Sequence, residues 1–180
     1  GILLNDTIFL MKMVIPHIKL EQSLWEKGLL HIAGVDEAGK GPWAGPVSAG
    51  AVIIHKKNQI VSSVRDSKLM TPLKREKAFD KICKKSSAFG VGIVSHEEID
   101  TIGIDFAVRK AMMLALTALE KMLGEKISYV IVDGSKTKKL EHYKSERILR
   151  GGLYHYSISA ASVLAKVTRD RMMKELAKIY

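Results

Sequence analysis

One segment restricts the fold more than any other: the eleven residues Asp36–Pro46, which read DEAGKGPWAGP. Its three glycines and two prolines are typical of a shaped loop rather than of a helix or a strand. The loop lies between His31–Val35, which predicts a strand running into Asp36, and Val47–Ile54. The second stretch is apolar on both alternations, as in a strand that is covered on both faces. The sequence therefore predicts two strands joined by a glycine-rich loop.

The remainder of the chain alternates helical and extended patterns. Thr71-Pro72 predicts a helix start, because a hydroxyl side chain caps the helix and proline suits its first position. Ser95 opens a second helical region, with Glu98 completing a capping-box pattern. Further helices are expected over residues 17–27, 105–123 and 157–180, and further strands over 89–95 and 129–132. This alternation predicts an α/β fold with a central mixed β-sheet flanked by helices.

Length and cysteine content place the chain in a broad class. Its 180 residues, 47% of them hydrophobic, fit one domain with a sizeable core. Cys83 is the only cysteine, which excludes a disulfide framework and suits a reducing, cytoplasmic location. No stretch approaches the roughly 18 apolar residues that span a membrane, so no membrane partner is expected. We interpret residues 1–13 as a non-native or upstream extension and residues 14–180 as the domain, and we expect a monomer.

The excess of positive charge favours a polyanionic partner. The formal net charge is +10, and residues 135–180 contain eleven basic against four acidic residues. A charge run of this kind describes either a solvated face or a surface that follows phosphates. Charge alone does not decide between the two.

Three acidic residues lie at the ends of apolar strands, where a carboxylate is energetically unfavourable unless it has a function. Asp36 and Glu37 follow an apolar strand, and Asp133 ends another. Carboxylates at the ends of buried strands meet at one edge of a sheet, where open α/β folds bind ligands. Mutually repelling carboxylates are neutralised by hard cations such as Mg²⁺ or Mn²⁺, which prefer oxygen ligands. With a basic surface, the pattern suggests metal-assisted phosphodiester chemistry.

Plainer interpretations of the same residues remain open at this point. Asp-Gly at 133–134 is a common turn dipeptide, and Asp36-Glu37 can cap the next element. A zinc site is unsupported, because no Cys and His spacing fits one. Cys83 lies in a lysine-rich helix with no obvious base, and Gly39-Lys40-Gly41 lacks the rest of a Walker motif.

Four ordered motifs carry a family resemblance. Ala33–Pro46 (AGVDEAGKGPWAGP) resembles the opening active-site motif of the type 2 ribonuclease H family, specifically bacterial ribonuclease HII. Asp66–Leu69, Val132–Gly134 and Ile158–Asp170 match further motifs in the same order, and the likeness covers roughly Pro16–Tyr180. The resemblance implies a ribonuclease H-like fold and cleavage of the RNA strand of RNA–DNA hybrids, or of DNA containing ribonucleotides. It also implies Mg²⁺ or Mn²⁺ held by four carboxylates.

The resemblance assigns roles residue by residue. Asp36, Glu37 and Asp133 match three of the four metal ligands. Gly39-Lys40-Gly41 matches a Gly-Arg-Gly whose backbone contacts 2′-hydroxyls, the groups that distinguish RNA from DNA. Lys40 keeps the charge of the arginine but lacks its planar fork. Ser67 and Lys68 match phosphate contacts, although a plain loop leading into a helix explains them as well.

Two departures from the family pattern bear on activity. The fourth carboxylate is expected at the position of Gly152 and is lost. Asp170 matches an acidic position that the family already has, so it does not compensate; it is explained as well by a contact with Arg169 or Arg171. The resemblance also implies a C-terminal segment beyond Tyr180 that specifies single embedded ribonucleotides, and this sequence lacks it.

These departures leave three functional interpretations. The first is an endoribonuclease of RNA–DNA hybrids, weakened by Gly152. On that interpretation, Gly152→Asp should raise Mn²⁺-dependent cleavage by orders of magnitude. The second is a non-catalytic protein that binds the hybrid on the same scaffold. The third is a nuclease of different specificity with the same fold.

Overall fold

The computed structural model describes residues 14–42, 44–134 and 140–179. The segment 1–13, interpreted above as an extension, lies outside the described residues, as do Trp43 of the glycine-rich loop, residues 135–139 of the lysine-rich stretch and Tyr180. No helix in the described part of the chain is long and apolar enough to cross a membrane.

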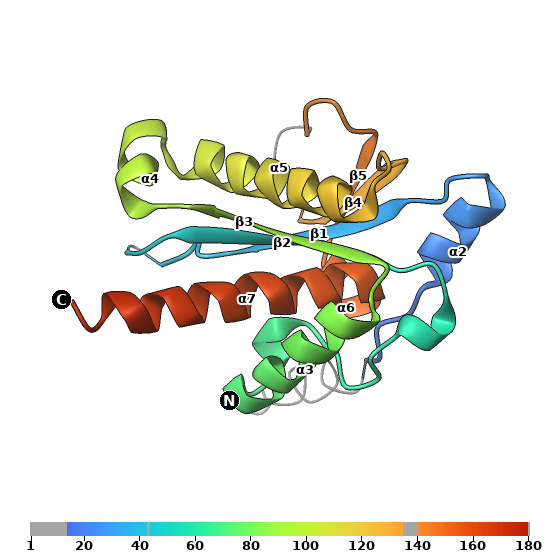
Figure 1. Cartoon of the computed structure of the whole chain (residues 1–180), viewed down its shortest axis with the longest axis horizontal. Coiled ribbons are helices and arrows are strands. Elements are labelled where there is room, and N and C mark those ends of the chain that lie inside the picture. The colour runs from blue at the N-terminus through green and yellow to red at the C-terminus, as the bar shows by residue number, and fades with distance from the viewer. Residues whose placement is uncertain (1–13, 43, 135–139, 180) are drawn as a thin grey trace.

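A mixed five-stranded sheet forms the centre of the molecule, which confirms the predicted architecture (Figure 1). The strand order is β3-β2-β1-β4-β5. Strands β1, β2 and β3 pair antiparallel, whereas β4 pairs parallel with both β1 and β5. The strands are β1 (Ile32–Ala38), β2 (Val47–Ile53), β3 (Ala88–Val94), β4 (Tyr129–Asp133) and β5 (Ser145–Ile148).

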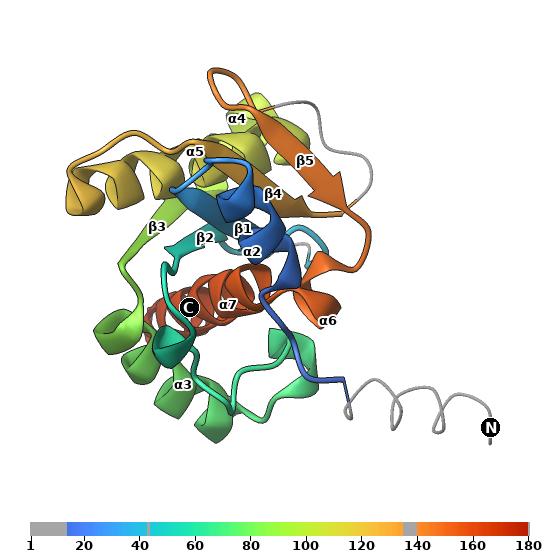
Figure 2. The same cartoon turned by 90° about the vertical axis from the view of Figure 1, so that its right-hand side faces the viewer.

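Helices cover both faces of the sheet. The long helix α5 (Ile104–Leu123) lies on one face and the long helix α7 (Tyr156–Leu176) on the other, with α3 (Pro72–Lys85) packed against α7 (Figures 1 and 2). The shorter helices are α2 (Lys19–Glu26), α4 (His96–Ile102) and α6 (Gly151–Tyr154), with 3-10 turns η1 (Lys57–Gln59) and η2 (Ser67–Leu69). The caps predicted at Thr71 and Ser95 are confirmed: each side chain accepts a backbone N–H of its helix.

The central strands are buried from both sides because the helices approach them very closely. Every residue of β2 is buried, as its apolar pattern predicted. A Cβ placed on Gly50 would lie 2.3 Å from the carbonyl oxygen of Ala161 in α7. A Cβ on Gly90 of β3 would lie 2.0 Å from the carbonyl oxygen of Ala115 in α5. Only glycine permits either contact, so the sheet and both long helices form one rigid support.

The structure corrects the sequence-based boundaries in two places. Strand β1 continues through Asp36 and Glu37 to Ala38, because its antiparallel register with β2 extends to the pair Ala38↔Ser48. The loop is therefore shorter than predicted, and both acids belong to the strand. Strand β5 and helix α6 were not predicted, because β5 is short and polar and α6 has two glycines in its single turn.

Candidate active site

Adjacent parallel strands bring the predicted acids together. Val35 of β1 is in register with Val132 of β4, so the next residues, Asp36 and Asp133, lie side by side. The Asp36 side chain is buried, with 7% of its surface exposed, and its Oδ1 accepts the backbone N–H of Glu37 at 2.8 Å. This register brings Asp36 and Asp133 together at the carboxyl ends of their strands, and Glu37, the next residue of β1, interacts electrostatically with both.

Burial and neighbouring negative charges raise the proton affinity of these three carboxylates. Burial, followed by the charges of Glu37 and Asp133, raises the pKa of Asp36 well above its ordinary value. Burial and the charge of Asp133 raise the pKa of Glu37, against the opposing effect of Lys40 and Lys68. Burial also raises the pKa of Asp133. Acids held in this way near one another are typical of a functional site, because a structural role would not require the repulsion.

A fourth carboxylate, Asp66, reaches the same place from the turn that precedes η2. Its charge contributes to the raised pKa of both Asp36 and Asp133. A Cβ placed on Gly152 would lie 3.0 Å from Oδ2 of Asp66 and 3.7 Å from Oδ2 of Asp133. The sequence did not identify Asp66 as a site residue, although Asp66 belongs to the motif Asp66–Leu69 that the family resemblance includes. Its cap position before η2 resembled any turn aspartate.

Basic side chains border the acids. The charge of Lys68 lowers the pKa of both Glu37 and Asp133, so its ammonium group lies near them, as its predicted role requires. Burial lowers the pKa of Arg147 in β5, whereas the charge of Glu37 raises it. Arg147 is a second residue that sequence reasoning missed, because strand β5 was itself not predicted. Lys40 forms an ion pair with Asp105 at 3.0 Å.

The backbone of Ser67 and the carboxylate of Asp170 have structural partners, whereas the predicted phosphate contact of Ser67 stays a prediction. Ser67 is buried; its N–H donates to Oγ of Ser162 and its carbonyl oxygen accepts from Arg75. The carboxylate of Asp170 pairs with Arg75 at 3.3 Å and Lys166 at 2.6 Å, not with the arginines beside it in sequence. Ser67 therefore anchors the turn that carries Asp66 and Lys68, and Asp170 helps to fasten α3 to α7.

The glycine-rich loop is fixed at one glycine and open at another. Gly39 has φ +105°, and a Cβ there would lie 2.6 Å from the carbonyl oxygen of Pro46 and 2.6 Å from Nε of Arg169. Arg169 holds the loop by donating to the carbonyl oxygens of Pro46 at 2.9 Å and Ala44 at 2.8 Å. A Cβ on Gly41 would meet no atom of the described residues within 4 Å. The backbone at Gly41 is thus exposed to an approaching ligand.

The donor set at this edge suits a hard divalent cation. All the candidate ligands are carboxylate oxygens, the ligands that Mg²⁺ and Mn²⁺ prefer. As the side chains stand, no three His, Cys, Asp or Glu residues in the described part of the chain enclose a point closely enough to hold an ion. Asp36, Glu37 and Asp133 are the residues that would hold such an ion, and its positive charge would offset the repulsion between them.

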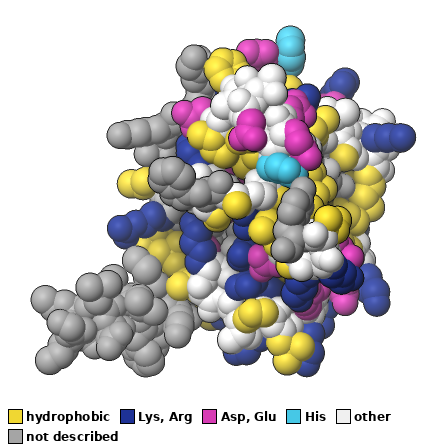
Figure 3. All heavy atoms as spheres, turned by 90° about the vertical axis from the view of Figure 1, so that its left-hand side faces the viewer, with side chains coloured by type: hydrophobic (Ala, Val, Ile, Leu, Met, Phe, Trp, Pro, Cys, Tyr) yellow, Lys and Arg dark blue, Asp and Glu magenta, His cyan; other side chains and the backbone are white. Residues whose placement is uncertain are grey.

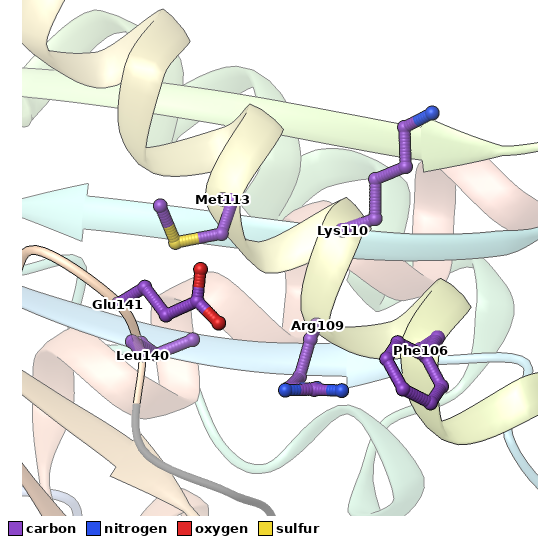
Figure 4. Close-up of a pocket in the computed structure, with 6 residues that line it drawn as sticks. All are labelled: Phe106, Arg109, Lys110, Met113, Leu140 and Glu141. Carbon is purple, nitrogen blue, oxygen red and sulfur yellow. The ribbon is translucent and has the colours of Figure 1, made fainter.

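Several hollows in the described part of the chain lie outside the carboxylate cluster, and one of them, of about 230 Å³, is lined by Gly39 of the glycine-rich loop and by residues of α4. Two others are larger. One, of about 260 Å³, lies between α5 and the segment that begins at Leu140; Arg109 stacks on Phe106 at its rim, 4.3 Å from the ring centroid (Figure 4). It contains none of the predicted site residues. The other, of about 510 Å³, is lined by basic side chains: Lys74, Lys77 and Lys81 of α3, and Arg65, which precedes η2. Figure 3 shows one face of the molecule, where acidic side chains gather mainly in the upper part and most of the basic side chains lie below and at the edges.

Comparison with known proteins places this architecture in a family. The family model for ribonuclease HII matches residues 33–180. Ribonuclease HII of Caldicellulosiruptor saccharolyticus is 42% identical over 164 residues, which are 91% of this chain and 77% of that protein. The crystal structure of ribonuclease H2 from Pyrococcus horikoshii aligns with TM-score 0.67 and 30% identity, over 82% of this chain and 75% of that one.

A more distant structure shares the fold. Bst-RNase HIII in complex with Mn²⁺ aligns with TM-score 0.64 and 16% identity, over 84% of this chain and 55% of that one. Neither the comparisons nor the site geometry favours the alternative of a non-catalytic hybrid-binding protein. The chain belongs to the ribonuclease HII family, the divalent-metal-dependent endoribonucleases that cleave the RNA strand of RNA–DNA hybrids.

Proposed function

We propose that Asp36, Glu37 and Asp133 of this chain hold Mg²⁺ or Mn²⁺ and direct hydrolysis of a phosphodiester bond in the RNA strand. The observation that carries the proposal is their convergence at the carboxyl ends of β1 and β4, where burial and nearby carboxylates raise the pKa of each. A rigid sheet buried between two long helices holds the two strands in register, so the carboxylates are positioned before substrate arrives.

The reaction is the addition of water to phosphorus with departure of the ribose oxygen. A bound divalent metal would polarise the phosphate and lower the pKa of the attacking water. Asp36 and Asp133 each keep one oxygen hydrogen-bonded to a backbone N–H, of Glu37 and Gly151 respectively, which fixes how the other oxygen points. Lys68 and Arg147, close to these acids, would offset the charge of the scissile phosphate.

The glycine-rich loop supplies recognition of the ribose. Gly41 presents backbone with open space around it, which lets a sugar approach, and Gly39 holds the loop in the required shape. Lys40 is half-exposed and would exchange its ion pair with Asp105 for a phosphate when nucleic acid binds. Backbone contact with a 2′-hydroxyl would select RNA over DNA at the cleaved position.

The nucleic-acid backbone would follow the basic groove along α3. The groove begins near η2, which also carries Lys68, and its lysines come from one helix face. The substrate is then a hybrid duplex or DNA containing ribonucleotides, bound with a strong dependence on salt. Changing Lys74, Lys77 and Lys81 together to glutamine should reduce the slope of log affinity against log salt by about 2.7. An unchanged slope would place the duplex elsewhere.

The pairing of β1 with β4 within one chain brings Asp36 and Asp133 together, so we propose that a monomer is sufficient for activity. Cys83 is a free thiol, which supports a reducing location such as the cytoplasm.

The decisive assay uses a 5′-labelled RNA strand annealed to DNA, with Mn²⁺ or Mg²⁺ present. The parent protein and a control, Asp80→Asn on the exposed face of α3, should cleave the RNA strand and leave an all-DNA duplex intact. Asp36→Asn should lose the cleavage. Equal cleavage by Asp36→Asn and the parent protein would refute the assignment of the site.

A further inference from the structure

The side-chain position at Gly152 is bordered by two carboxylate oxygens from different parts of the chain. Oδ2 of Asp66 and Oδ2 of Asp133 lie 3.0 Å and 3.7 Å from the point where a Cβ of residue 152 would stand. Residue 152 is where the family pattern places its fourth carboxylate. The oxygen of Asp66 therefore stands beside the space that the lost side chain would enter.

Both aspartates are oriented by the backbone in the same way. Oδ1 of Asp66 accepts the N–H of Lys68 at 2.9 Å, and Oδ1 of Asp133 accepts the N–H of Gly151 at 2.7 Å. Each carboxylate is thus held by one oxygen, and the other oxygen faces the space at Gly152. A carboxylate fixed through one oxygen can offer the second to a cation without losing its anchor.

The turn that carries Asp66 is itself firmly held. The N–H of Ser67 donates to Oγ of Ser162 in α7 at 3.0 Å, and Arg75 donates to the carbonyl oxygens of Ser67 and Met70. These contacts tie η2 to α7 and α3. Asp66 is therefore presented to Asp133 by the rigid part of the fold, so its closeness does not depend on a freely moving loop.

We propose that Asp66 supplies the fourth carboxylate of the metal site, in the place left by Gly152. This inference rests on the proposed function of Asp36, Glu37 and Asp133 and adds one ligand to it. It also replaces the expectation that Gly152→Asp raises cleavage by orders of magnitude. If Asp66 already acts there, an added aspartate brings a fifth negative charge against Asp66 and little gain.

The first experiment measures Mn²⁺ binding by isothermal titration calorimetry, without substrate. Asp66→Asn keeps the cap on Lys68 N–H because its amide oxygen also accepts, but it removes the charge. We expect Mn²⁺ affinity to fall about tenfold or more, while Asp80→Asn binds like the parent protein. Asp66→Ser, which also retains a capping oxygen, provides the same comparison if the asparagine variant unfolds.

The outcomes separate this inference from the proposed function. If Asp36→Asn loses Mn²⁺ affinity and the Asp66 variants do not, Asp66 is not a ligand and the three-carboxylate site stands. If Asp36→Asn also binds Mn²⁺ like the parent protein, the proposed site itself is wrong.

A second experiment tests whether a carboxylate introduced at position 152 can replace Asp66 as a metal ligand. The double variant Asp66→Asn with Gly152→Asp should regain Mn²⁺ affinity to within about threefold of the parent protein, because it again has four carboxylates. The backbone at Gly152 does not have positive φ, and its nearest neighbour is the end of the Asp66 side chain, so the variant is sterically accessible. Double-variant affinity no higher than that of Asp66→Asn would overturn the equivalence.

Discussion

Strand β1 has titratable side chains at both of its ends, and the two groups differ in how their charges are met. At the carboxyl end, Asp36 and Glu37 face Asp133, and burial with repulsion raises the pKa of all three. At the amino end, His31, which directly precedes β1, contacts His55, which follows β2, with 3.2 Å between Nδ1 of His31 and Nε2 of His55. Nε2 of His31 meets Oε2 of Glu125 at 2.8 Å.

The difference separates a working site from a structural one on the same strand. The histidine end contains donors, acceptors and an acid that satisfy one another, so removing a member should cost stability. The carboxylate end contains like charges whose repulsion destabilises the fold. Removing one of these carboxylates should therefore cost activity and not stability. A substitution at the histidine end should therefore lower stability and leave activity unchanged, whereas substitution of a carboxylate at the other end should lower activity without lowering stability.

The largest expected effect is that of Asp36→Asn. Loss of one metal ligand should lower cleavage of an RNA–DNA hybrid by at least about 100-fold. The melting temperature without metal should stay equal or rise, because the variant removes a buried charge that its neighbours repel. Cleavage kinetics and thermal unfolding on the same preparation test both parts. A variant that loses activity only because it melts lower would break the comparison.

The glycine-rich loop allows structure and function to be separated within the carboxylate end. Gly39→Ala should destabilise the fold by about 1–3 kcal/mol, because φ is positive and the Cβ would collide with Pro46 and Arg169. Gly41→Ala should change the unfolding free energy by less than about 0.5 kcal/mol, yet slow cleavage of a hybrid. Urea unfolding with parallel cleavage assays measures both. Normal cleavage by Gly41→Ala would exclude close approach of the ribose there.

His31→Ala tests the amino end. The variant removes the side-chain contacts with His55 and Glu125, and we expect a loss of about 1–2 kcal/mol in unfolding free energy. Cleavage at 25 °C should remain at the parent level, because the carboxylates lie at the other end of β1. Chemical denaturation and the hybrid assay decide the matter, and reduced cleavage by a folded variant would show that the ends are coupled.

Local patterns were sufficient for the framework. The caps at Thr71 and Ser95, the double-sided burial of β2 and the long helix α5 follow from short-range chemistry, and each is found. The carboxylate end was predictable in part, since Asp36 and Asp133 both end apolar runs. Asp66 and Arg147 were not, because their proximity to these acids depends on the packing of η2 and β5. An aspartate in a turn and an arginine in a short polar strand have no local sequence signal that would assign them to an active site.

The smallest expected effect concerns the pH dependence of stability. Burial, with the neighbouring charge of His31, lowers the pKa of His55. The unfolded chain therefore binds a proton first as pH falls through about 6.5, so the stability contributed by neutral His55 is present above that pH and lost below it. The raised pKa of Asp36 acts with the opposite sign, since there the folded chain binds the proton first. His55→Gln should remove the histidine contribution and leave that of Asp36. Between pH 8 and pH 5 the unfolding free energy of this variant should therefore fall less than that of the parent protein, or rise. Urea unfolding of the parent protein, His55→Gln and a control far from His55, the half-exposed His96→Gln, measures the difference. Parallel curves for all three would show that the amino end does not titrate with folding.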